Sequence, residues 1–285
     1  MSKPGMEKVS VIGAGFMGSG IAQVSAMAGL EVYIYDSKPE AVAKALEGIK
    51  WSLAKLKSKG RLRDDPEMVL KRISKIDQLD AAASSDLVIE AVYESVPLKQ
   101  ELFEKLGKIV KPGAIIGTNT SSIPIHLLSS KAPGPERVIG THFFGPVPLM
   151  GLVELVMGPE TTEGTLETAK GYVRRIGKTP IVVRKPSPGF LVNRIFFATA
   201  MEALRCYSEG IGTPEDIDTG MKLGYGWAAG PFEIMDNAGL DIMAGVFGVL
   251  GGEPPAQIQE LLKQGRLGRK VGKGFYHYGP DGKKV

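Results

Sequence analysis

Side chains that build covalent or metal-held frameworks are scarce in this sequence. Its 285 residues include a single cysteine, Cys206, so no intramolecular disulfide can form. With only three histidines beside it, a cysteine-based metal cage is not expected, and we expect no bound metal. The fold must therefore be stabilised by packing and hydrogen bonding.

Long apolar runs are also missing. No stretch of about 18 uncharged apolar residues occurs, so a helical membrane span is not expected. Glu7 and Lys8 directly precede the first apolar run, and no small-residue cleavage pattern follows, so a secretory signal is not expected either. These absences predict a soluble protein of a reducing compartment, the cytoplasm, without a membrane partner.

Positively charged residues exceed negatively charged residues only slightly. Lys and Arg number 35 and Asp and Glu 31, which gives a net charge of +4. Nucleic-acid binders usually carry a larger excess, so no nucleic-acid partner is expected, although a phosphate-bearing ligand is compatible. Hydrophobic residues make up 43% of the chain, enough for packed cores. At about 100–200 residues per domain, the length predicts two domains.

The first part of the chain alternates short apolar runs with helix-length amphipathic stretches. Runs typical of buried parallel strands cover residues 9–12, 31–35, 87–90, 114–117 and 137–141. Helices are expected at 16–28, 39–60 and 97–110. Two further runs, 152–157 and 179–183, flank a helical stretch at 162–176 and would extend the sheet. The alternation predicts βαβ units and an α/β fold with a doubly wound, Rossmann-type sheet.

The character of the sequence changes at Lys185-Pro186-Ser187-Pro188-Gly189. Two prolines and a glycine within five residues are typical of a linker. Beyond it strand signals nearly disappear, and helices are expected at 191–209, 214–223, 231–250 and 256–264. We therefore expect an α/β domain over residues 1–186 and an all-helical domain over residues 187–285.

The first predicted strand runs into a glycine-rich turn and then into a helix, in the order Gly13-Ala14-Gly15-Phe16-Met17-Gly18. In this context the first glycine permits the tight turn and the second lets the backbone approach a pyrophosphate. The third lets helix and strand pack closely. The backbone N–H groups at the start of the helix, at Phe16 and Met17, then face the anion. This pattern predicts a dinucleotide site.

The second predicted strand ends in Asp36, 18 residues beyond Gly18. An acidic side chain at this place binds the ribose 2′-hydroxyl and repels a 2′-phosphate. Asp36 therefore favours NAD over NADP as the cofactor, although Lys38 lies nearby. The alternative is a tight turn between strand and helix in which Asp36 is only a cap.

A histidine and a glutamate could supply the base that oxidation by NAD requires. His142 follows the run 137–141, near the carboxyl end of the sheet, where open α/β folds bind ligands. Twelve residues later Glu154 interrupts an apolar run, where a carboxylate is costly unless it is paired. Pairing with His142 would fix the imidazole tautomer and raise its basicity. The alternative is a structural histidine and an unrelated carboxylate.

Two polar positions allow either of two roles. Ser121 lies in Asn119-Thr120-Ser121-Ser122, after a predicted strand, and Asn193 follows Pro188-Gly189-Phe190. Their chemistry alone favours helix caps, but both could instead hydrogen-bond a substrate.

Basic residues gather between positions 44 and 63, where only one acid, Glu47, occurs. The seven basic residues are Lys44, Lys50, Lys55, Lys57, Lys59, Arg61 and Arg63. Ser52 and Lys59 are seven positions apart and therefore share a helix face. Such a run is usually a solvated helix, but with a highly phosphorylated substrate it becomes an anion-attracting surface.

In combination these residues resemble the NAD-dependent L-3-hydroxyacyl-CoA dehydrogenases, a family that includes bacterial 3-hydroxybutyryl-CoA dehydrogenases. The resemblance extends nearly from end to end. Its matching segments are the glycine-rich turn, Asp36, Asp86-Leu87-Val88-Ile89-Glu90-Ala91, 119–122, His142-Phe143-Phe144, Leu152-Val153-Glu154, Pro188-Gly189-Phe190 with Asn193-Arg194, Gly230-Pro231-Phe232-Glu233 and Gly268-Arg269-Lys270 with Gly274-Phe275-Tyr276.

The resemblance implies reversible oxidation of an L-3-hydroxyacyl-CoA, of short chain such as 3-hydroxybutyryl-CoA, to the 3-oxoacyl-CoA. It implies that His142 is the general base, that Glu154 orients it, and that Ser121 and Asn193 bind the reacting oxygens. It further implies a homodimer through the helical domain. The additional contacts that it implies are, for NAD, Glu94, Lys99, Asn119 and Lys270, and for CoA, Ser52 and Lys59.

The chain departs from the family's usual residues at two positions, with Gly145 in place of Asn and Gly151 in place of Lys. Loss of the Asn would remove a hydrogen bond near the nicotinamide. Two rival hypotheses remain: a dehydrogenase of a free β-hydroxy acid, against which the basic run argues, and a catalytically silent NAD-binding protein, against which His142 and Glu154 together argue.

Overall fold

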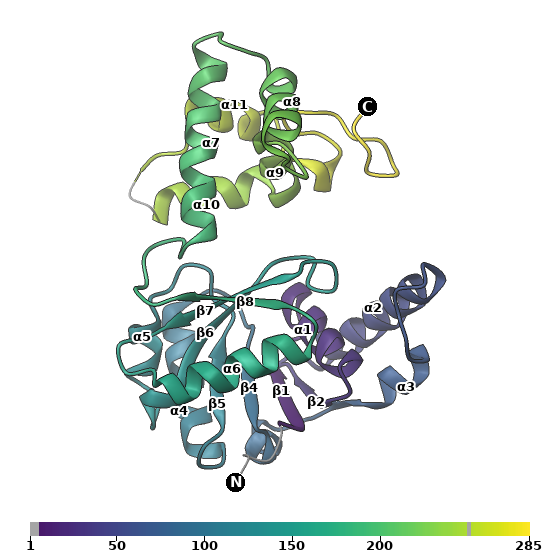
Figure 1. Ribbon diagram of the computed structural model, residues 1–285, viewed down its shortest axis with the longest axis vertical. Coiled ribbons are helices and arrows are strands. Elements are labelled where there is room, and N and C mark those ends of the chain that lie inside the picture. The colour runs from purple at the N-terminus through teal and green to yellow at the C-terminus, as the bar shows by residue number, and fades with distance from the viewer. Residues whose placement is uncertain (1–5, 250–251) are drawn as a thin grey trace. The chain divides into compact units, whose positions relative to one another are not determined.

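The structure is a computed structural model that describes residues 6–249 and 252–285 (Figure 1). The chain forms two compact units that divide between Ser187 and Pro188. The first is a sheet with flanking helices and the second is helical. Among the described residues, no helix has both the length and the apolar character needed to span a bilayer.

The first unit contains an eight-stranded sheet in the order β3-β2-β1-β4-β5-β6-β7-β8. Every neighbouring pair is parallel except β6 and β7, which are antiparallel. The strands are β1 (Lys8–Ile12), β2 (Glu31–Tyr35), β3 (Ile73–Lys75), β4 (Leu87–Glu90), β5 (Ile115–Thr118), β6 (Val138–Phe143), β7 (Leu152–Met157) and β8 (Thr179–Val183). The expected α/β fold with a doubly wound sheet is confirmed, and the two later runs do extend it.

The helices of this unit are α1 (Phe16–Met27), α2 (Pro39–Ser58), α3 (Pro66–Lys71), α4 (Val96–Ile109), α5 (Ile125–Ser129) and α6 (Glu163–Arg175). All four residues of β4 and all four of β5 are buried, so both faces of the central sheet are covered. The short elements β3, α3 and α5 were not expected, because segments of three to six residues carry too little periodicity to be recognised.

The strand expected at 137–141 is displaced: β6 covers Val138–Phe143, so His142 lies within the strand rather than after it. Only residues 144–151 connect β6 to β7. A parallel crossover needs about a dozen residues or more, so this short connection makes β7 return antiparallel. In the resulting register His142 lies directly opposite Glu154.

The second unit contains α7 (Val192–Ser208), α8 (Pro214–Tyr225), α9 (Pro231–Ala238), α10 (Leu240–Val249) and α11 (Ala256–Lys263). The single helix expected at 231–250 is wrong: it divides at Gly239, whose φ of 100° does not fit a right-handed helix. Residue 250 lies outside the described residues. Aromatic rings form the core, with 5.8 Å between the centroids of Phe197 and Phe247.

Two buried aspartates tie the C-terminal tail to this helical unit. The carboxylate of Asp236 accepts hydrogen bonds from the backbone N–H groups of Phe275 (2.8 Å) and Tyr276 (2.9 Å) and from the Tyr278 hydroxyl (2.9 Å). Asp218 accepts from the Tyr276 hydroxyl at 2.8 Å. Burial raises the pKa of both aspartates, and the hydrogen bonds only partly offset this rise.

Replacing Asp236 should loosen the tail. Asp236→Ala leaves three donors without their acceptor, and we expect the free energy of unfolding to fall by about 3 kcal/mol. Urea unfolding followed by the fluorescence of Trp227, in a Trp51→Phe background, measures the change in this unit. Asp281→Ala, at an exposed carboxylate, is the control. Equal stability of the two variants would contradict the role assigned to Asp236.

Candidate active site

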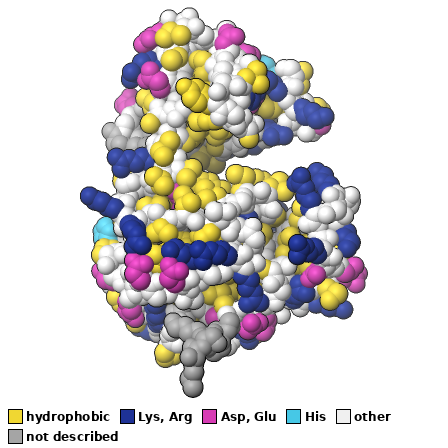
Figure 2. Space-filling model, viewed as in Figure 1, with side chains coloured by type: hydrophobic (Ala, Val, Ile, Leu, Met, Phe, Trp, Pro, Cys, Tyr) yellow, Lys and Arg dark blue, Asp and Glu magenta, His cyan; other side chains and the backbone are white. Residues whose placement is uncertain are grey.

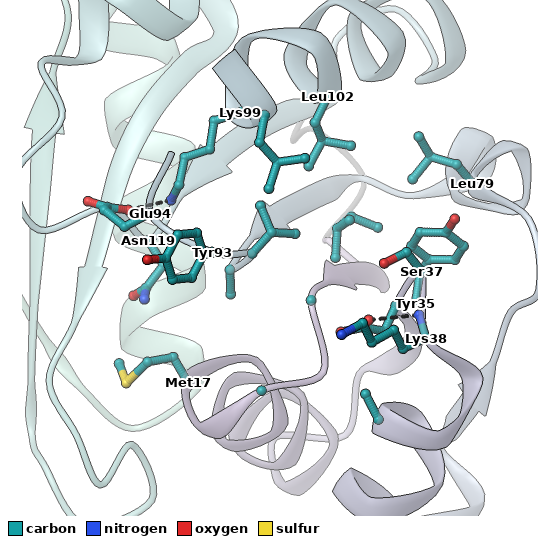
Figure 3. Close-up of a pocket in the computed structure, with 18 of the residues that line it drawn as sticks. Met17, Tyr35, Ser37, Lys38, Leu79, Tyr93, Glu94, Lys99, Leu102 and Asn119 are labelled. Atoms are coloured by element: carbon teal, nitrogen blue, oxygen red, sulfur yellow. Dashed lines mark hydrogen bonds and ion pairs between the residues drawn. The ribbon is translucent and has the colours of Figure 1, made fainter. Parts of the chain in front are cut away.

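A cavity of about 790 Å³ lies where β1 and β2 end (Figure 3). Most of the residues expected to bind the dinucleotide line it: Gly13, Gly15, Phe16, Met17, Asp36, Glu94, Lys99 and Asn119. Ser121 lines it as well. Side chains far apart in the sequence thus share one space, as expected for the carboxyl end of a doubly wound sheet.

The glycine-rich turn has the geometry that an anion site needs. A Cβ at Gly13 would lie 2.4 Å from the Ala91 carbonyl oxygen, and one at Gly18 would lie 1.8 Å from the Gly13 oxygen. At Gly15, by contrast, a Cβ would have no atom of the described residues within 4 Å. Likewise, no described side chain caps the start of α1. Gly15 therefore leaves the helix N-terminus open to a pyrophosphate.

Asp36 closes this turn against the end of β2. Its carboxylate accepts hydrogen bonds from the backbone N–H of Ala14 at 2.8 Å and of Lys38 at 3.0 Å. A carboxylate offers about four acceptor sites, so these bonds leave capacity for the hydroxyls of a ribose. The position and the chemistry both fit the adenosine end of NAD.

A buried lysine bridges two glutamates, Glu90 and Glu94, an arrangement that we call the Lys99 cage. Lys99 and Glu94 line the cavity, and Figure 3 shows the ion pair between them. The ammonium nitrogen of Lys99 lies 2.9 Å from Glu90 Oε1 and 2.7 Å from Glu94 Oε2. Thr118 donates its hydroxyl to Glu90 at 2.6 Å, and Thr120 donates to Glu94. Only 1% of the Lys99 side chain is exposed, so its ion pairs with the two glutamates are shielded from solvent.

The two glutamates of the cage differ in their acidity. Burial raises the pKa of Glu90, and the favourable contacts of its carboxylate do not offset this. Burial also raises the pKa of Glu94, but Lys99 and the surrounding hydrogen bonds outweigh it and the net pKa lies below the usual range. Glu94 also accepts from the Ser121 backbone N–H at 3.2 Å. The cage therefore anchors the loop that carries Ser121.

Glu90 was not expected as a site residue, although a signal was present in the sequence. It ends the apolar run 87–90 as a carboxylate, in the same way that Glu154 interrupts its own run. A carboxylate within or at the end of an apolar run needs a partner when it is buried, and this holds for Glu90 as it does for Glu154.

His142 and Glu154 meet across the antiparallel pair β6–β7. The distance from His142 Nδ1 to Glu154 Oε2 is 2.6 Å, and the Glu154 side chain is fully buried. The ring of Phe144 lies over the imidazole, with 4.6 Å between ring centroids. A carboxylate on Nδ1 holds that nitrogen as the N–H donor, so Nε2 carries the basic lone pair. The expected pairing is confirmed.

Asn119 connects the neighbouring strand ends. Its side-chain oxygen accepts a hydrogen bond from the Phe143 backbone N–H at 2.9 Å, which links the loop after β5 to the end of β6. Ser121 is exposed in this loop and does not cap α5, whose N-cap is Pro124. The interpretation of Ser121 as a helix cap is therefore wrong.

Asn193 and Lys270 belong to the second unit. Asn193 is the second residue of α7, whose N-cap is Leu191, so the cap interpretation is wrong here as well. The Lys270 ammonium lies 2.6 Å from each carboxylate oxygen of Asp241. The roles of both residues toward substrate and NAD stay predictions.

Ser52 and Lys59 line a second cavity of about 540 Å³, bounded by α1, α2 and residues 146–149. They do share one face of α2, as their spacing predicts. Phe16 lines both this cavity and the cavity of the glycine-rich turn, so one side chain borders both spaces.

Phe16 also explains one departure from the family pattern. A Cβ at Gly145 would lie 2.6 Å from Cε1 of the Phe16 ring, so the ring takes the space that a larger residue would need. Gly151 is different, because a Cβ there would have no neighbour among the described residues within 4 Å. No group of three potential metal-ligating His, Cys, Asp or Glu side chains occurs in the described ranges.

Comparison with known proteins gives matches over nearly the whole chain. Residues 8–186 match the NAD binding domain of 3-hydroxyacyl-CoA dehydrogenase, and residues 189–278 match its C-terminal domain. A probable 3-hydroxybutyryl-CoA dehydrogenase of Deinococcus radiodurans is 43% identical over 95% of this chain and 100% of its own length. The human mitochondrial hydroxyacyl-coenzyme A dehydrogenase is 39% identical over 96% of this chain and 91% of its own.

A solved structure also matches nearly the whole length of this chain. The crystal structure of (S)-3-hydroxybutyryl-CoA dehydrogenase from Ralstonia eutropha superposes with a TM-score of 0.89 at 40% sequence identity. The match covers 96% of this chain and 99% of that one. The similarity thus includes both units.

Removing the central charge of the Lys99 cage should affect both stability and dinucleotide binding. Lys99→Met leaves two buried carboxylates without their cation, and we expect the free energy of unfolding to fall by about 3–5 kcal/mol. Without the cation, the pKa values of the Glu90 and Glu94 carboxyls rise in the folded state. The loss in the free energy of unfolding should therefore grow as pH rises. Thermal melts across pH and titration with NAD measure both effects.

A matched control lies on the same helix. Lys108 forms an exposed pair with Glu104, at 2.7 Å, and neither residue lines the cavity of the glycine-rich turn. Lys108→Met should change the melting temperature and the Kd for NAD little, because exposed pairs contribute little. Equal effects of the two substitutions would refute the role of the cage.

Proposed function

This chain belongs to the 3-hydroxyacyl-CoA dehydrogenase family, and we propose that His142 is the base through which it oxidises an L-3-hydroxyacyl-CoA. Family membership makes it an NAD-dependent oxidoreductase that converts a 3-hydroxyacyl-CoA to the 3-oxoacyl-CoA. The observation that carries the proposal is the 2.6 Å contact between His142 and Glu154 on adjacent buried strands.

Oxidation of the alcohol requires loss of a proton from oxygen and a hydride from C3. NAD, when bound, supplies the acceptor for the hydride. Nε2 of His142 accepts the hydroxyl proton, while Glu154 stabilises the imidazolium that results. In the reverse direction the protonated His142 returns the proton to the forming alkoxide. The pair thus serves both directions of a reversible reaction.

Ser121 and Asn193 complete the proposed substrate site by hydrogen-bonding the reacting oxygens. The link from Asn119 to Phe143 and the bond from Ser121 to Glu94 support this for Ser121, because they anchor its loop beside β6. For NAD, we assign the pyrophosphate to the turn at Gly13–Gly18, including the N–H groups of Phe16 and Met17, and the adenosine ribose to Asp36. The remaining proposed NAD contacts are Glu94, Lys99, Asn119 and Lys270.

The proposed substrate is a short-chain thioester such as 3-hydroxybutyryl-CoA, with Ser52 and Lys59 binding the CoA portion. The cavity that these residues share along the basic face of α2 supports a phosphorylated substrate over a free β-hydroxy acid. The His142–Glu154 pair supports an active enzyme over a silent NAD-binding relative.

We also propose that two copies of the chain form a homodimer through the helical unit. Several large apolar side chains of this unit are well exposed, namely Ile195, Ile211, Leu223, Tyr225 and Ile242. Of these five, Leu223 at 83% and Tyr225 at 80% are the most exposed, and both lie near the end of α8. A second copy of the chain would cover such side chains.

His142→Gln should lower kcat for 3-hydroxybutyryl-CoA by about 10²–10⁴-fold, because the amide cannot accept the proton. Glu154→Gln, which keeps the shape but removes the charge, should lower kcat by about 10- to 100-fold. NADH absorbance measures turnover, and the Kd for NAD should remain near the wild-type value. Undiminished turnover by His142→Gln would refute its role.

The substrate class is tested by comparing 3-hydroxybutyryl-CoA with free 3-hydroxybutyrate. We expect a higher kcat/KM for the thioester, and Lys59→Ala should raise its KM by about tenfold through loss of a charged contact. Lys57→Ala, on the same helix but outside the cavity lining, should have a smaller effect. Preference for the free acid would support the rival dehydrogenase.

Assembly is tested by light scattering of the full chain. The wild type should have the mass of a dimer, and Leu223→Glu should shift it toward the monomer because a charge would be buried in the contact. Met68→Glu places the same charge at an exposed apolar position of α3 and should leave the mass unchanged. A monomeric wild type would contradict the proposal.

A further inference from the structure

Trp51 is a large aromatic side chain that α2 leaves in contact with solvent. Its exposed fraction is 66%, whereas Ile49 and Leu53 of the same helix are buried at 2% and 0%. An aromatic side chain of this size is normally covered when it serves only packing. Trp51 instead lines the 540 Å³ cavity together with Ser52 and Lys59.

One cation lies over this indole, and two more line the same cavity. The ammonium nitrogen of Lys55 lies 4.6 Å from the centroid of the Trp51 ring, a cation–π contact. Lys55, Lys59 and Arg61 all line the same cavity. Spacings of four residues between positions 51, 55 and 59 keep these side chains on one face of α2. Figure 2 shows Lys and Arg side chains gathered over α2.

Another part of the cavity lining comes from the connection between β6 and β7 and from the start of α1. It is formed by residues 146–149, which follow β6 and therefore His142 by a few positions, and by Phe16. Since Phe16 also borders the dinucleotide cavity, one elongated ligand could extend from the end of β6 to Trp51. The cavity is thus lined by apolar residues of the β6–β7 connection and by cations and an aromatic ring at α2.

We propose that Trp51 stacks on the adenine of the CoA substrate, while Lys55, Lys59 and Arg61 bind its phosphates. This assignment rests on the proposed function and adds a residue that sets affinity for the nucleotide end of the thioester. Every nucleobase has a face that stacks on an aromatic ring. The 3′-phosphate and the diphosphate of CoA complement the three cations. Lys55 covers one face of the indole, and the large exposed fraction leaves area for the purine.

A kinetic comparison separates the purine from the rest of the substrate. The ratio of kcat/KM for 3-hydroxybutyryl-CoA to kcat/KM for 3-hydroxybutyryl-pantetheine measures the contribution of the nucleotide. Trp51→Leu should lower this ratio by about tenfold, within the range known for stacking on aromatic side chains. Trp51→Phe, which keeps an aromatic face, should restore most of it. An unchanged ratio in Trp51→Leu would overturn the proposal.

Fluorescence supplies a readout that does not require turnover. The chain has two tryptophans, so in a Trp227→Phe background the emission comes from Trp51 alone. Adenosine 3′,5′-diphosphate and CoA should quench it in a saturable manner, and pantetheine should not. Equal quenching by CoA and pantetheine, or none by either, would overturn the stacking.

These measurements also separate two kinds of failure. Turnover of 3-hydroxybutyryl-CoA with an unchanged ratio and no purine-dependent quenching would refute the role of Trp51 alone. Absence of turnover with any CoA ester would refute the proposed function, whereas the fluorescence titration would still report whether adenosine 3′,5′-diphosphate binds at Trp51.

Discussion

The site depends on one cross-strand contact, in which the imidazole of His142 meets the carboxylate of Glu154 inside a sheet that is covered on both faces. A buried carboxylate is tolerated only with a partner, and a histidine that serves as a base needs one ring nitrogen held. The antiparallel return of β7 satisfies both needs, because it places the two residues in register. The short connection that prevents a parallel crossover thus places the proposed base beside its carboxylate.

A second buried charge organises the neighbouring wall. Lys99 is held between Glu90 and Glu94, and through Glu94 it anchors the loop that carries Ser121. Asn119 then ties that loop to Phe143, next to His142. The proposed base, the substrate hydroxyl contact and the dinucleotide wall are therefore connected by hydrogen bonds and ion pairs within one unit. Such satisfied polar networks hold side chains in fixed positions inside a low-dielectric interior.

The two departures from the family pattern, Gly145 and Gly151, have different surroundings. At Gly145 the ring of Phe16 lies where a Cβ would be, so a larger side chain there would require the ring to move. At Gly151 a side chain would enter open space. Phe16 and Trp51 both line the second cavity and give it aromatic surfaces that the proposed substrate would contact.

Local patterns in the sequence determined much of the fold. The strand runs at 31–35, 87–90, 152–157 and 179–183 match the structure, because apolar periodicity and bounding glycines act between near neighbours. The glycine-rich turn and the pairing of His142 with Glu154 followed from steric need and from the cost of a buried charge. Tertiary structure alone decided that β7 returns antiparallel, that Glu90 shares Lys99 with Glu94, and that Ser121 and Asn193 are not caps. These features depend on which distant segments become neighbours, and no local periodicity encodes that.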